Sequence, residues 1–336
     1  MRGTWNTGCN IGCKNKINVK FSQECVFTLQ FKSESCKIVF WMGSLSEGRE
    51  QMSKIRIMAD STCDLSPELL EEYGIKILPL NIVMDDTSYL DGVETTPDKI
   101  YTWADANRTT PKTSAPGIEA AIEFLRPVVE AGDEACYLGI SEQMSATCQV
   151  LRLAAEELDY TEHVCVVDSM NLSTGIGLQV LYAAELAQSG CTLAELEEQL
   201  KEYRERVRAS FVVDTLTYLQ RGGRCSAVTA LMGNALKLKP RIAVADGKMG
   251  VSKKYRGNRK KTVMDYVKDM EADLRGAEKK RVFITHSGIE QGIVDEVKSY
   301  LESLRHFDAI YTTRAGGVIS SHCGPGTLGV LFVEGK

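Results

Sequence analysis

The amino-acid sequence predicts an α/β protein with two sheets, the first mostly parallel and doubly wound and the second mixed. Apolar runs of strand length alternate with segments of helix length between about residues 55 and 170, which is typical of repeated βαβ units. Further along, Asp246-Gly247 separates two apolar runs and favours a hairpin turn. A length of 336 residues suits two domains. We expect residues 52–170 and 171–336 to form two α/β domains, with a ligand bound between them.

Local signals place the elements of the first domain. Ser66 followed by Pro67 is a good helix start, and Gly74 ends that helix. The apolar run 75–83 predicts one continuous strand. Apolar patterning predicts the other elements of this half. They are strands at 55–59, 135–140 and 163–167, helices at 97–106 and 118–132, and a helix that follows the serine loop and ends at about residue 158.

The second half begins with a helix-rich stretch and continues with mixed signals. An apolar stripe between Leu193 and Val207 predicts an amphipathic helix. Just before the last strand, Gly316-Gly317 opens a hydroxyl-rich segment that contains His322 and the corner Gly324-Pro325-Gly326. Because Gly and Pro bend the chain, we expect a turn that holds one imidazole in place. The remaining signals predict strands at 211–214, 236–244, 249–255, 282–285, 310–313 and 328–333, and helices at 263–274 and 293–304.

Residues 1–51 differ from the rest of the chain. They show no apolar periodicity and carry seven basic and four acidic residues, whereas residues 52–336 carry 33 basic and 41 acidic residues. The codons for Glu47–Gln51 can form a purine-rich run at the usual distance before a bacterial start codon. Our hypothesis is that Met52 is the natural start and that residues 1–51 are a translated leader; the alternative is a disordered tail. Peptides from residues 14–50 in the native protein would contradict the first hypothesis.

Composition and charge argue against several classes of function. The net charge of −5 disfavours general nucleic-acid binding, and no apolar run is long enough for membrane insertion. The first twenty residues lack the apolar core of a secretory signal. Eleven cysteines without CxxC pairs are typical of reduced thiols, so we expect a cytoplasmic protein. Cys9 and Cys13 alone are a weak zinc signal, and the four histidines stand apart; neither a metal site nor a cofactor is predicted.

Three hydroxyl-rich turns are expected to meet the segment around His322. They lie at residues 60–65, 113–117 and 141–147, next to predicted strand–helix units, where α/β proteins bind their ligands. Hydroxyl groups and helix N-termini donate hydrogen bonds to anions, and a suitably protonated histidine does the same. This combination suits a carboxylate, and an apolar pocket would also favour the protonated acid.

The same residues leave an enzymatic alternative open. Ser145 or Ser141 could act as a nucleophile, with His322 as the base and Asp60 or Asp168 as its orienting acid. Against this, neither serine lies in a G-x-S-x-G motif, and Ser145 has the setting of a helix cap. The sequence carries no dinucleotide or P-loop motif. Two alternatives therefore stay open beside a protein that binds and carries a fatty acid. One is a serine-type acyl hydrolase, and the other is a binding module for another amphipathic acid.

Five motifs, in this order, resemble one known family. They are Asp60-Ser61-Thr62-Cys63-Asp64-Leu65, Thr113-Ser114-Ala115-Pro116, Ser145-Ala146-Thr147, Tyr218-Leu219-Gln220-Arg221-Gly222-Gly223-Arg224 and Ser321-His322-Cys323-Gly324-Pro325-Gly326. Together they resemble the DegV family over about residues 54–334. The serine loop departs from the family pattern Ser-x-x-Leu-Ser-Gly-Thr, because Ala146 replaces the glycine and Glu142 brings an acid close to the site. Both differences bear on the geometry of Ser145.

The resemblance implies a two-domain protein that binds one long-chain fatty acid and is not itself an enzyme. The acyl tail would lie in an apolar tunnel and the carboxylate at the domain interface. In bacteria, such proteins present the acid to a separate fatty acid kinase, a dihydroxyacetone-kinase-like protein, which makes acyl phosphate for phospholipid synthesis. By motif, Thr113, Ser145 and His322 would hold the carboxylate, and the neighbouring Ser114 and Ser141 could assist.

The resemblance also implies a docking surface for the kinase. Arg224 matches the arginine of the family's glycine-glycine-arginine turn, and Arg256 falls near a basic position used in docking. The sequence around Arg256 is basic in an otherwise acidic protein. A solvated hairpin edge explains that run equally well. The run consists of Lys253, Lys254, Arg256, Arg259, Lys260 and Lys261.

Overall fold

The computed structural model describes residues 28–30, 35–37, 54–229 and 238–336, and the chain divides into two units, Met1–Met52 and Ser53–Lys336. In the first unit, β1 (Thr28–Gln30) pairs antiparallel with β2 (Ser35–Lys37). The hypothesis about Met52 and the weak zinc signal at Cys9 and Cys13 lie outside the described residues. The remaining described elements belong to the second unit.

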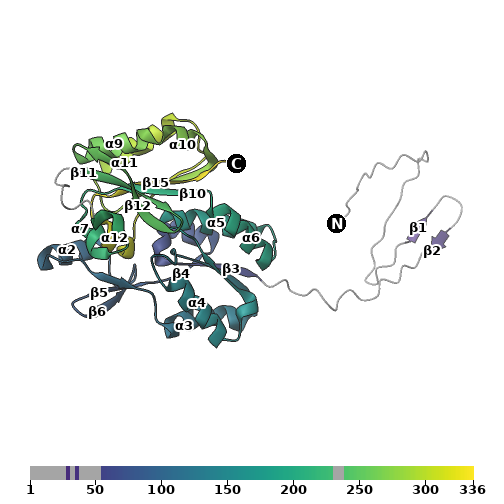
Figure 1. The fold of residues 1–336 in the computed structure, drawn as a ribbon. Helices are drawn as coiled ribbons and strands as arrows, with labels where there is room; N and C mark the ends of the chain where they lie inside the picture. Colours follow the sequence, from purple (N-terminus) through teal and green to yellow (C-terminus); the bar gives the residue numbers. More distant parts are fainter. Residues whose placement is uncertain (1–27, 31–34, 38–53, 230–237) are drawn as a thin grey trace, which may run out of the picture. The chain divides into compact units, whose positions relative to one another are not determined.

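The first sheet is parallel and doubly wound, as predicted. Its strand order is β4-β3-β8-β9, and each neighbouring pair is parallel. Helices α3 and α4 cover one face and α5 and α6 the other (Figure 1). The strands are β3 (Ile55–Asp60), β4 (Lys76–Leu78), β8 (Glu134–Gly139) and β9 (Val164–Asp168). The helices are α3 (Ile118–Ala131), α4 (Thr147–Glu157), α5 (Thr174–Gln188) and α6 (Leu193–Arg204).

Short elements connect these strands. The 3-10 turn η1 (Ser61–Cys63) follows β3, and η2 (Thr161–His163) precedes β9. Helix α1 (Pro67–Tyr73) has Ser66 as its N-cap, Pro in its first turn and Gly74 in the left-handed region at its end. These are the signals that predicted α1.

A small antiparallel sheet, which the sequence did not predict, lies beside the parallel one. Its order is β6-β5-β7, with β5 (Asn81–Met84), β6 (Thr87–Leu90) and β7 (Lys112–Ser114). The run 75–83, predicted as one strand, therefore forms parts of two strands in different sheets. Pro79 lies between them and has no amide hydrogen to donate to a sheet, which breaks the run. Helix α2 (Pro97–Asn107) connects β6 to β7.

The second large sheet is mixed, as predicted. Its order is β12-β11-β10-β15-β13-β14, and only the pair β13–β14 is parallel. Asp246 and Gly247 both have positive φ in the turn between β11 and β12, which confirms the hairpin; the start of its first predicted strand, 236–237, lies outside the described residues. The strands are β10 (Val207–Val212), β11 (Leu238–Ala245), β12 (Lys248–Arg256), β13 (Ala277–His286), β14 (Ile310–Arg314) and β15 (Leu328–Glu334).

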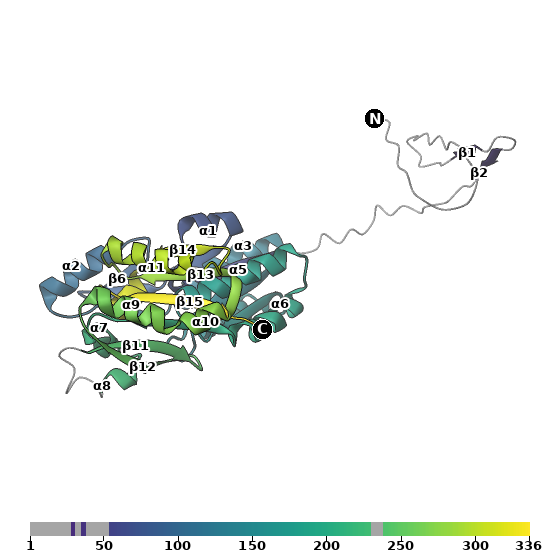
Figure 2. The same cartoon turned by 90° about the horizontal axis from the view of Figure 1, so that it is seen from above.

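Helices cover both faces of the mixed sheet. On one face, α9 (Arg259–Asp269), α10 (Glu271–Arg275) and α11 (Gln291–Ser303) build a separate core (Figures 1 and 2). On the other face lies α5, which also contacts β3 and β8 of the parallel sheet. Because α5 packs between two sheets, its buried residues run all round the helix instead of forming one stripe. The predicted domain boundary after residue 170 stays a prediction.

Three short helices complete the second half. Helix α7 (Thr217–Gly222) and helix α8 (Ser226–Thr229) precede β11, and Figure 2 shows α8 beside β12. Helix α12 (Gly317–Cys323) occupies the glycine-histidine segment that was predicted as a turn. The helix forms there because buried carboxylates from the first half accept hydrogen bonds from its first backbone N–H groups.

Candidate ligand-binding site

The order of the parallel sheet creates a crevice at the carboxyl ends of β3 and β8. The chain places β4 on one side of β3 and β8 on the other, so the connections diverge between these two strands. Asp60, the last residue of β3, accepts a hydrogen bond of 2.8 Å from the backbone N–H of Ile140, just after β8. The serine loop 141–146 begins at this point. A parallel sheet of this topology binds its ligands at such a position.

A cavity of about 280 Å³ opens beside this crevice. Its volume is close to the lower end of the ~300–1000 Å³ that small-molecule sites occupy. Its wall is mainly apolar, with contributions from Leu80, Ile140, Met144, Met249, Val318 and Ile319. Its polar side chains are Thr113, Ser114, Ser145, Arg224 and His322. The structure therefore brings together four of the five residues that the sequence predicted as ligand-binding, with Ser141 as the exception.

His322 and Thr113 form the polar centre of this cavity. His322 lies in the last turn of α12, Thr113 lies on β7, and His322 Nε2 is 2.7 Å from Thr113 Oγ1, although the residues are 209 positions apart. Burial and, to a smaller extent, the positive charge of Arg224 together lower the pKa of His322 to about 4. The imidazole is therefore neutral at pH 7. If it donates through Nε2, the hydroxyl hydrogen of Thr113 is free to point into the cavity.

The second ring nitrogen of His322 has no hydrogen-bond partner among the described residues. Gly222, the last residue of α7, packs directly against this nitrogen. A Cβ atom added to Gly222 would lie only 2.2 Å from His322 Nδ1. Any larger residue at Gly222 would displace the ring. The glycine-glycine-arginine turn therefore contacts the imidazole directly, a role that the sequence did not predict.

Ser145 and Ser114 reach the cavity from a loop and from a strand, respectively. Ser145 Oγ lies 2.8 Å from Thr147 Oγ1 at the start of α4. The interpretation of Ser145 as a helix cap is wrong, because Ala146 is the N-cap residue and makes no side-chain cap bond. Ser114 is the last residue of β7 and pairs with Asn81 of β5. Both hydroxyls therefore lie on the cavity wall without a part in capping α4.

Ser141 has a different role in the structure. Its hydroxyl is fully buried and donates a 2.7 Å hydrogen bond to the carbonyl of Gly247, in the hairpin turn between β11 and β12. A Cβ atom at Gly247 would lie 2.6 Å from Ser141 Oγ, so the contact requires glycine there. Ser141 joins the serine loop to the mixed sheet and does not line the cavity.

The two predicted docking arginines lie in different surroundings. Arg224 lines the cavity and donates to the carbonyl of Gly222 at 2.8 Å. Arg256 is exposed at the end of β12 and pairs with Leu238 in the hairpin. Most of the basic run around Arg256 is neutralised by acids, through the pairs Lys253–Asp269, Arg259–Asp214, Arg259–Glu290, Lys260–Glu296 and Lys261–Asp265. Within the described ranges, Lys254 and Arg256 are the members of this run without an acidic partner.

Two buried aspartates hold the other end of α12. Asp64 accepts a 2.8 Å hydrogen bond from the N–H of Gly316, and Asp91 accepts one of 2.7 Å from that of Gly317. Burial raises the pKa of Asp64 to about 8 and also raises the pKa of Asp91. Asp64 belongs to the turn 60–65, which was expected to meet this segment. Asp91 was missed, because nothing around it in the sequence distinguishes it from a surface turn residue.

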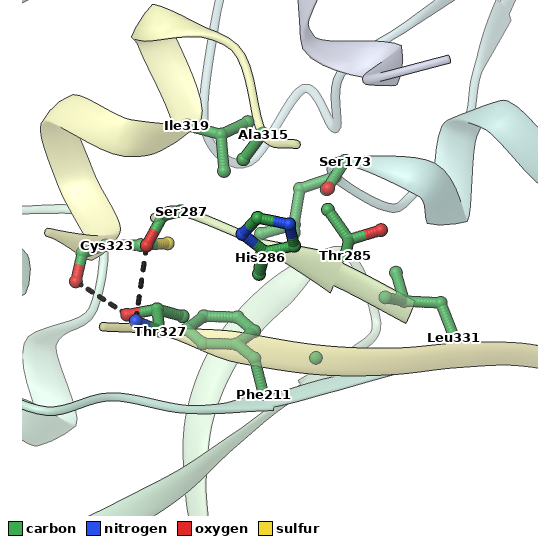
Figure 3. Close-up of a pocket in the computed structure, with 12 residues that line it drawn as sticks. Ser173, Phe211, Thr285, His286, Ser287, Ala315, Ile319, Cys323, Thr327 and Leu331 are labelled. Atoms are coloured by element: carbon green, nitrogen blue, oxygen red, sulfur yellow. Dashed lines mark hydrogen bonds between the residues drawn. The ribbon is translucent and has the colours of Figure 1, made fainter. Parts of the chain in front are cut away.

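A second, smaller cavity lies beside the first, next to strands of the mixed sheet. It has a volume of about 20 Å³, enough for one water molecule, and shares Leu172, Ile319 and Cys323 with the larger cavity. Phe211 and Leu331 of the sheet face it in Figure 3. The two cavities share part of one wall, and together they are called the apolar path from His322 toward the mixed sheet.

Hydroxyl groups on the wall of the smaller cavity are engaged with one another and with the backbone. Thr327 Oγ1 donates to the carbonyl of Cys323 at 3.0 Å, and Ser287 Oγ accepts from the N–H of Thr327 at 3.3 Å (Figure 3). Ser287 Oγ also donates to the carbonyl of Gly324. Since these polar groups are already paired, this end of the path suits an apolar group.

Comparison with known proteins identifies the family. Residues 54–335 match the family model described as "Uncharacterised protein, DegV family". The chain belongs to the DegV family. The match confirms the resemblance that the five motifs indicated, over almost the same residues.

Relatives and solved structures agree with this membership. A DegV domain-containing protein of Clostridium perfringens is 35% identical over 285 residues, covering 84% of this chain and 99% of that protein. A structure described as fatty acid binding of a DegV family protein from Thermus thermophilus is 31% identical, with a TM-score of 0.77 and coverage of 84% and 99%. A stearic acid-binding protein from Eubacterium ventriosum is 26% identical, with a TM-score of 0.73 and coverage of 84% and 98%.

In this DegV protein, the described residues do not form the triad of the hydrolase alternative. The hydroxyl bonded to His322 is that of Thr113, whereas Ser145 is bonded to Thr147. Asp60 accepts from Thr62 and Ile140, and Asp168 accepts from the N–H groups of Glu142 and Met170. The buried imidazole, with its pKa near 4, is also a weak base at neutral pH.

The described residues contain neither a candidate metal site nor a helix that could span a membrane. No group of three or more His, Cys, Asp or Glu side chains there has the arrangement of a metal site. No helix in the same residues combines the length and apolar character needed to cross a bilayer.

Proposed function

We propose that this DegV protein binds one long-chain fatty acid and acts as its carrier. The carboxyl group lies at Thr113, Ser145 and His322, and the acyl chain follows the apolar path toward Phe211 and Leu331. The observation that carries the proposal is the shape of the site, an apolar cavity with one group of hydroxyls and a neutral imidazole at one end. The relatives described as fatty-acid-binding proteins support it.

The polar end of the cavity favours a carboxyl group over other head groups. Thr113, Ser114 and Ser145 offer hydroxyl donors, and Arg224 adds a guanidinium on the same wall. Hydrogen bonds from hydroxyls and a nearby cation stabilise a carboxylate, while the apolar wall favours the protonated acid. A neutral His322 serves either form, since it orients the hydroxyl of Thr113 without contributing charge.

The carrier role includes delivery to a fatty acid kinase. In this proposal a cytoplasmic, dihydroxyacetone-kinase-like enzyme phosphorylates the bound acid, and the acyl phosphate enters phospholipid synthesis. Arg224 and Arg256 serve as docking residues, and the DegV protein supplies no catalytic group. The position of Arg224 supports this assignment, because it lies at the polar end of the cavity, where the carboxyl group must be reached.

Native mass spectrometry of the purified full-length protein tests binding. The expected result is one mass increment per chain, which denaturation releases as a fatty acid of one or two chain lengths. An empty protein that also fails to take up added palmitate or stearate would exclude the proposal.

The kinase role has its own test. The loaded protein is incubated with ATP and a dihydroxyacetone-kinase-like fatty acid kinase, and acyl phosphate is trapped with hydroxylamine as a hydroxamate. Arg256→Ala is expected to lower the rate while keeping the bound acid. Equal rates for the wild type and this variant would remove Arg256 from the docking surface.

A further inference from the structure

The serine loop 141–146 presents Ser145 to the cavity, and the loop is folded around its first residue. Ser141 is fully buried, and its carbonyl accepts hydrogen bonds from the N–H groups of Met144 at 2.8 Å and Ser145 at 3.1 Å. Its hydroxyl accepts a third from the N–H of Gln143 at 3.2 Å. The position of Ser145 therefore follows from that of Ser141.

Ser141 is itself anchored to two other loops. Its N–H donates to the carbonyl of Asn171 at 2.9 Å, in the loop between β9 and α5. Its hydroxyl donates to the carbonyl of Gly247 at 2.7 Å, 106 positions along the chain, in the turn between β11 and β12. One buried serine thus connects the loop after β8 to a turn of the mixed sheet.

The hairpin turn fits closely against the serine loop. Gly247 has a φ of +73°, and a Cβ atom added to it would lie 2.6 Å from Ser141 Oγ and 3.3 Å from Gln143 Cγ. Two residues further along, Met249 of β12 lines the cavity. The same end of the hairpin therefore contributes to the cavity wall and holds the loop that carries Ser145.

The hydroxyl of Ser145 depends on this placement. It is bonded to Thr147 Oγ1 at 2.8 Å, and either oxygen can be the donor. When Thr147 donates, the hydrogen of Ser145 is free to bond a carboxyl group in the cavity. Hydrogen bonds between hydroxyl groups and oxygen acceptors span only about 2.5–3.0 Å, so a loop shift of about 1 Å would break that contact.

We propose that Ser141 and Gly247 position Ser145 for the carboxyl group of the ligand. Ser141 was expected from its motif to assist at this group; in this inference it does so through Ser145, without touching the ligand. Gly247 belongs to no motif that the sequence indicated, and its carbonyl is the acceptor that holds Ser141. The inference rests on the proposed function and deepens it, because it adds two positioning residues to the head-group site.

A double-mutant cycle on the full-length protein tests the inference, with palmitate as the ligand and isothermal calorimetry as the measurement. Ser145→Ala removes one proposed hydrogen bond to the carboxyl group and should weaken binding about tenfold. Ser141→Ala removes the bond to Gly247 and should weaken binding about fivefold, because Ser145 is then misplaced. The double variant should bind no more weakly than Ser145→Ala alone, since the two residues act as one unit.

A pair of glycine variants tests the hairpin contact separately. Gly247→Ala places a methyl group against Ser141 Oγ and should weaken palmitate binding about fivefold. Gly132→Ala at the end of α3 is the matched control, because Gly132 also has a positive φ but nothing lies within 4 Å of its added Cβ. Both variants carry the backbone strain of alanine at positive φ, but the control should keep palmitate affinity within about twofold.

Other outcomes would overturn the inference in distinguishable ways. If the losses of Ser141→Ala and Ser145→Ala multiply in the double variant, Ser141 does not act through Ser145. If Ser141→Ala does not fold, the glycine pair decides, and equal palmitate affinities for Gly247→Ala and Gly132→Ala would reject the hairpin contact. If Ser145→Ala binds palmitate as tightly as the wild type, the positioning role is wrong while the fatty-acid carrier stands. If the wild type binds no palmitate, the proposed function fails as well.

Discussion

The two ends of helix α12 differ in how their polar groups are satisfied. At the N-terminal end, the N–H groups of Gly316, Gly317 and Val318 all donate to Asp64 or Asp91. At the C-terminal end, His322 is bonded through Nε2 to Thr113, and its Nδ1 has no partner among the described residues. The first end is closed and buried, whereas the second faces a cavity.

This difference separates a structural contact from a binding site. Buried polar groups in folded proteins almost always have partners, so the complete pairing at the N-terminal end indicates a role in holding the helix. His322 and Thr113, by contrast, line the cavity and are bonded to each other there, which indicates a role in holding a ligand. Both contacts come from the first half of the chain, so two distant loops fix the position of one imidazole.

The largest expected effect comes from breaking the closed end with Asp91→Ala. The substitution leaves two backbone N–H groups and the hydroxyl of Ser61 without their acceptor. Since each buried donor without a partner costs about 1–3 kcal/mol, we expect the free energy of unfolding to fall by about 3 kcal/mol. Urea denaturation measures it. Asp91→Asn keeps one carbonyl acceptor and should lose less; equal losses in both variants would contradict the capping role.

The next effect comes from displacing the imidazole with Gly222→Ala. The added methyl group would collide with His322 Nδ1, and overpacking of this kind costs about 1–3 kcal/mol. Gly292→Ala in α11 is the matched control, because nothing lies within 4 Å of its added Cβ, and it should gain up to about 1 kcal/mol from helix propensity. Thermal unfolding compares the two variants. A stabilised Gly222→Ala protein that retains its ligand would show that the ring has room to move.

A smaller effect is expected from removing the imidazole at the C-terminal end of α12 with His322→Ala. Fatty-acid affinity should fall about tenfold, or about 1.4 kcal/mol, because Thr113 loses the partner that orients its hydroxyl. The free energy of unfolding should change by less than about 1 kcal/mol, since the variant also removes an unpaired buried nitrogen. Thr113→Val combined with His322→Ala should lose less than the sum of the single losses. Full lipid stoichiometry in His322→Ala would contradict the assigned head-group site.

Per pH unit, the smallest expected effect is a difference in pH dependence between the two ends. Asp64 has a pKa of about 8 in the folded protein against 3.8 in the unfolded chain, so its contribution to stability is greatest below pH 4 and declines as the pH rises toward 8. His322, with a pKa of about 4 against 6.5, acts in the opposite sense, since stability falls as the pH drops from 6.5 toward 4. Each slope is at most about 1.4 kcal/mol per pH unit.

Urea denaturation between pH 4 and pH 8 separates these two contributions. Asp64→Asn should remove the decline toward pH 8 and leave the histidine effect in place. His322→Ala should do the reverse. If both variants follow the wild-type profile, neither buried group titrates in this range.

Elements with local signals could be predicted from the sequence. Ser66, Pro67 and Gly74 bound α1, and Asp246-Gly247 forms the predicted hairpin turn. The antiparallel sheet β6-β5-β7 was missed because its strands are three or four residues long and Pro79 lies inside an apolar run. Short strands of this kind are held by pairing across the sheet, for which a single stretch of sequence carries little signal.

In the candidate site, too, some features could be predicted from local sequence signals and others depend on contacts between distant residues. The glycines around His322 drew attention to it, and the motifs that carry the family resemblance pointed to Thr113 and Ser145. Ser141 belongs to one of those motifs as well, yet its hydroxyl is bonded to Gly247 in the other half of the fold. The importance of Asp91 and Gly222 follows from contacts with α12 that bring together residues far apart in the chain.

By itself, the sequence determined the α/β class, the parallel and mixed sheets, and the family to which the chain belongs. These follow from local patterns of apolar residues, caps and turns, because each pattern acts within a few residues. The tertiary structure decided which hydroxyl meets His322 and which acids hold α12. Such contacts join residues as far apart as Asp91 and Gly317, 226 positions along the chain, and they exist only once packing has brought the two halves together.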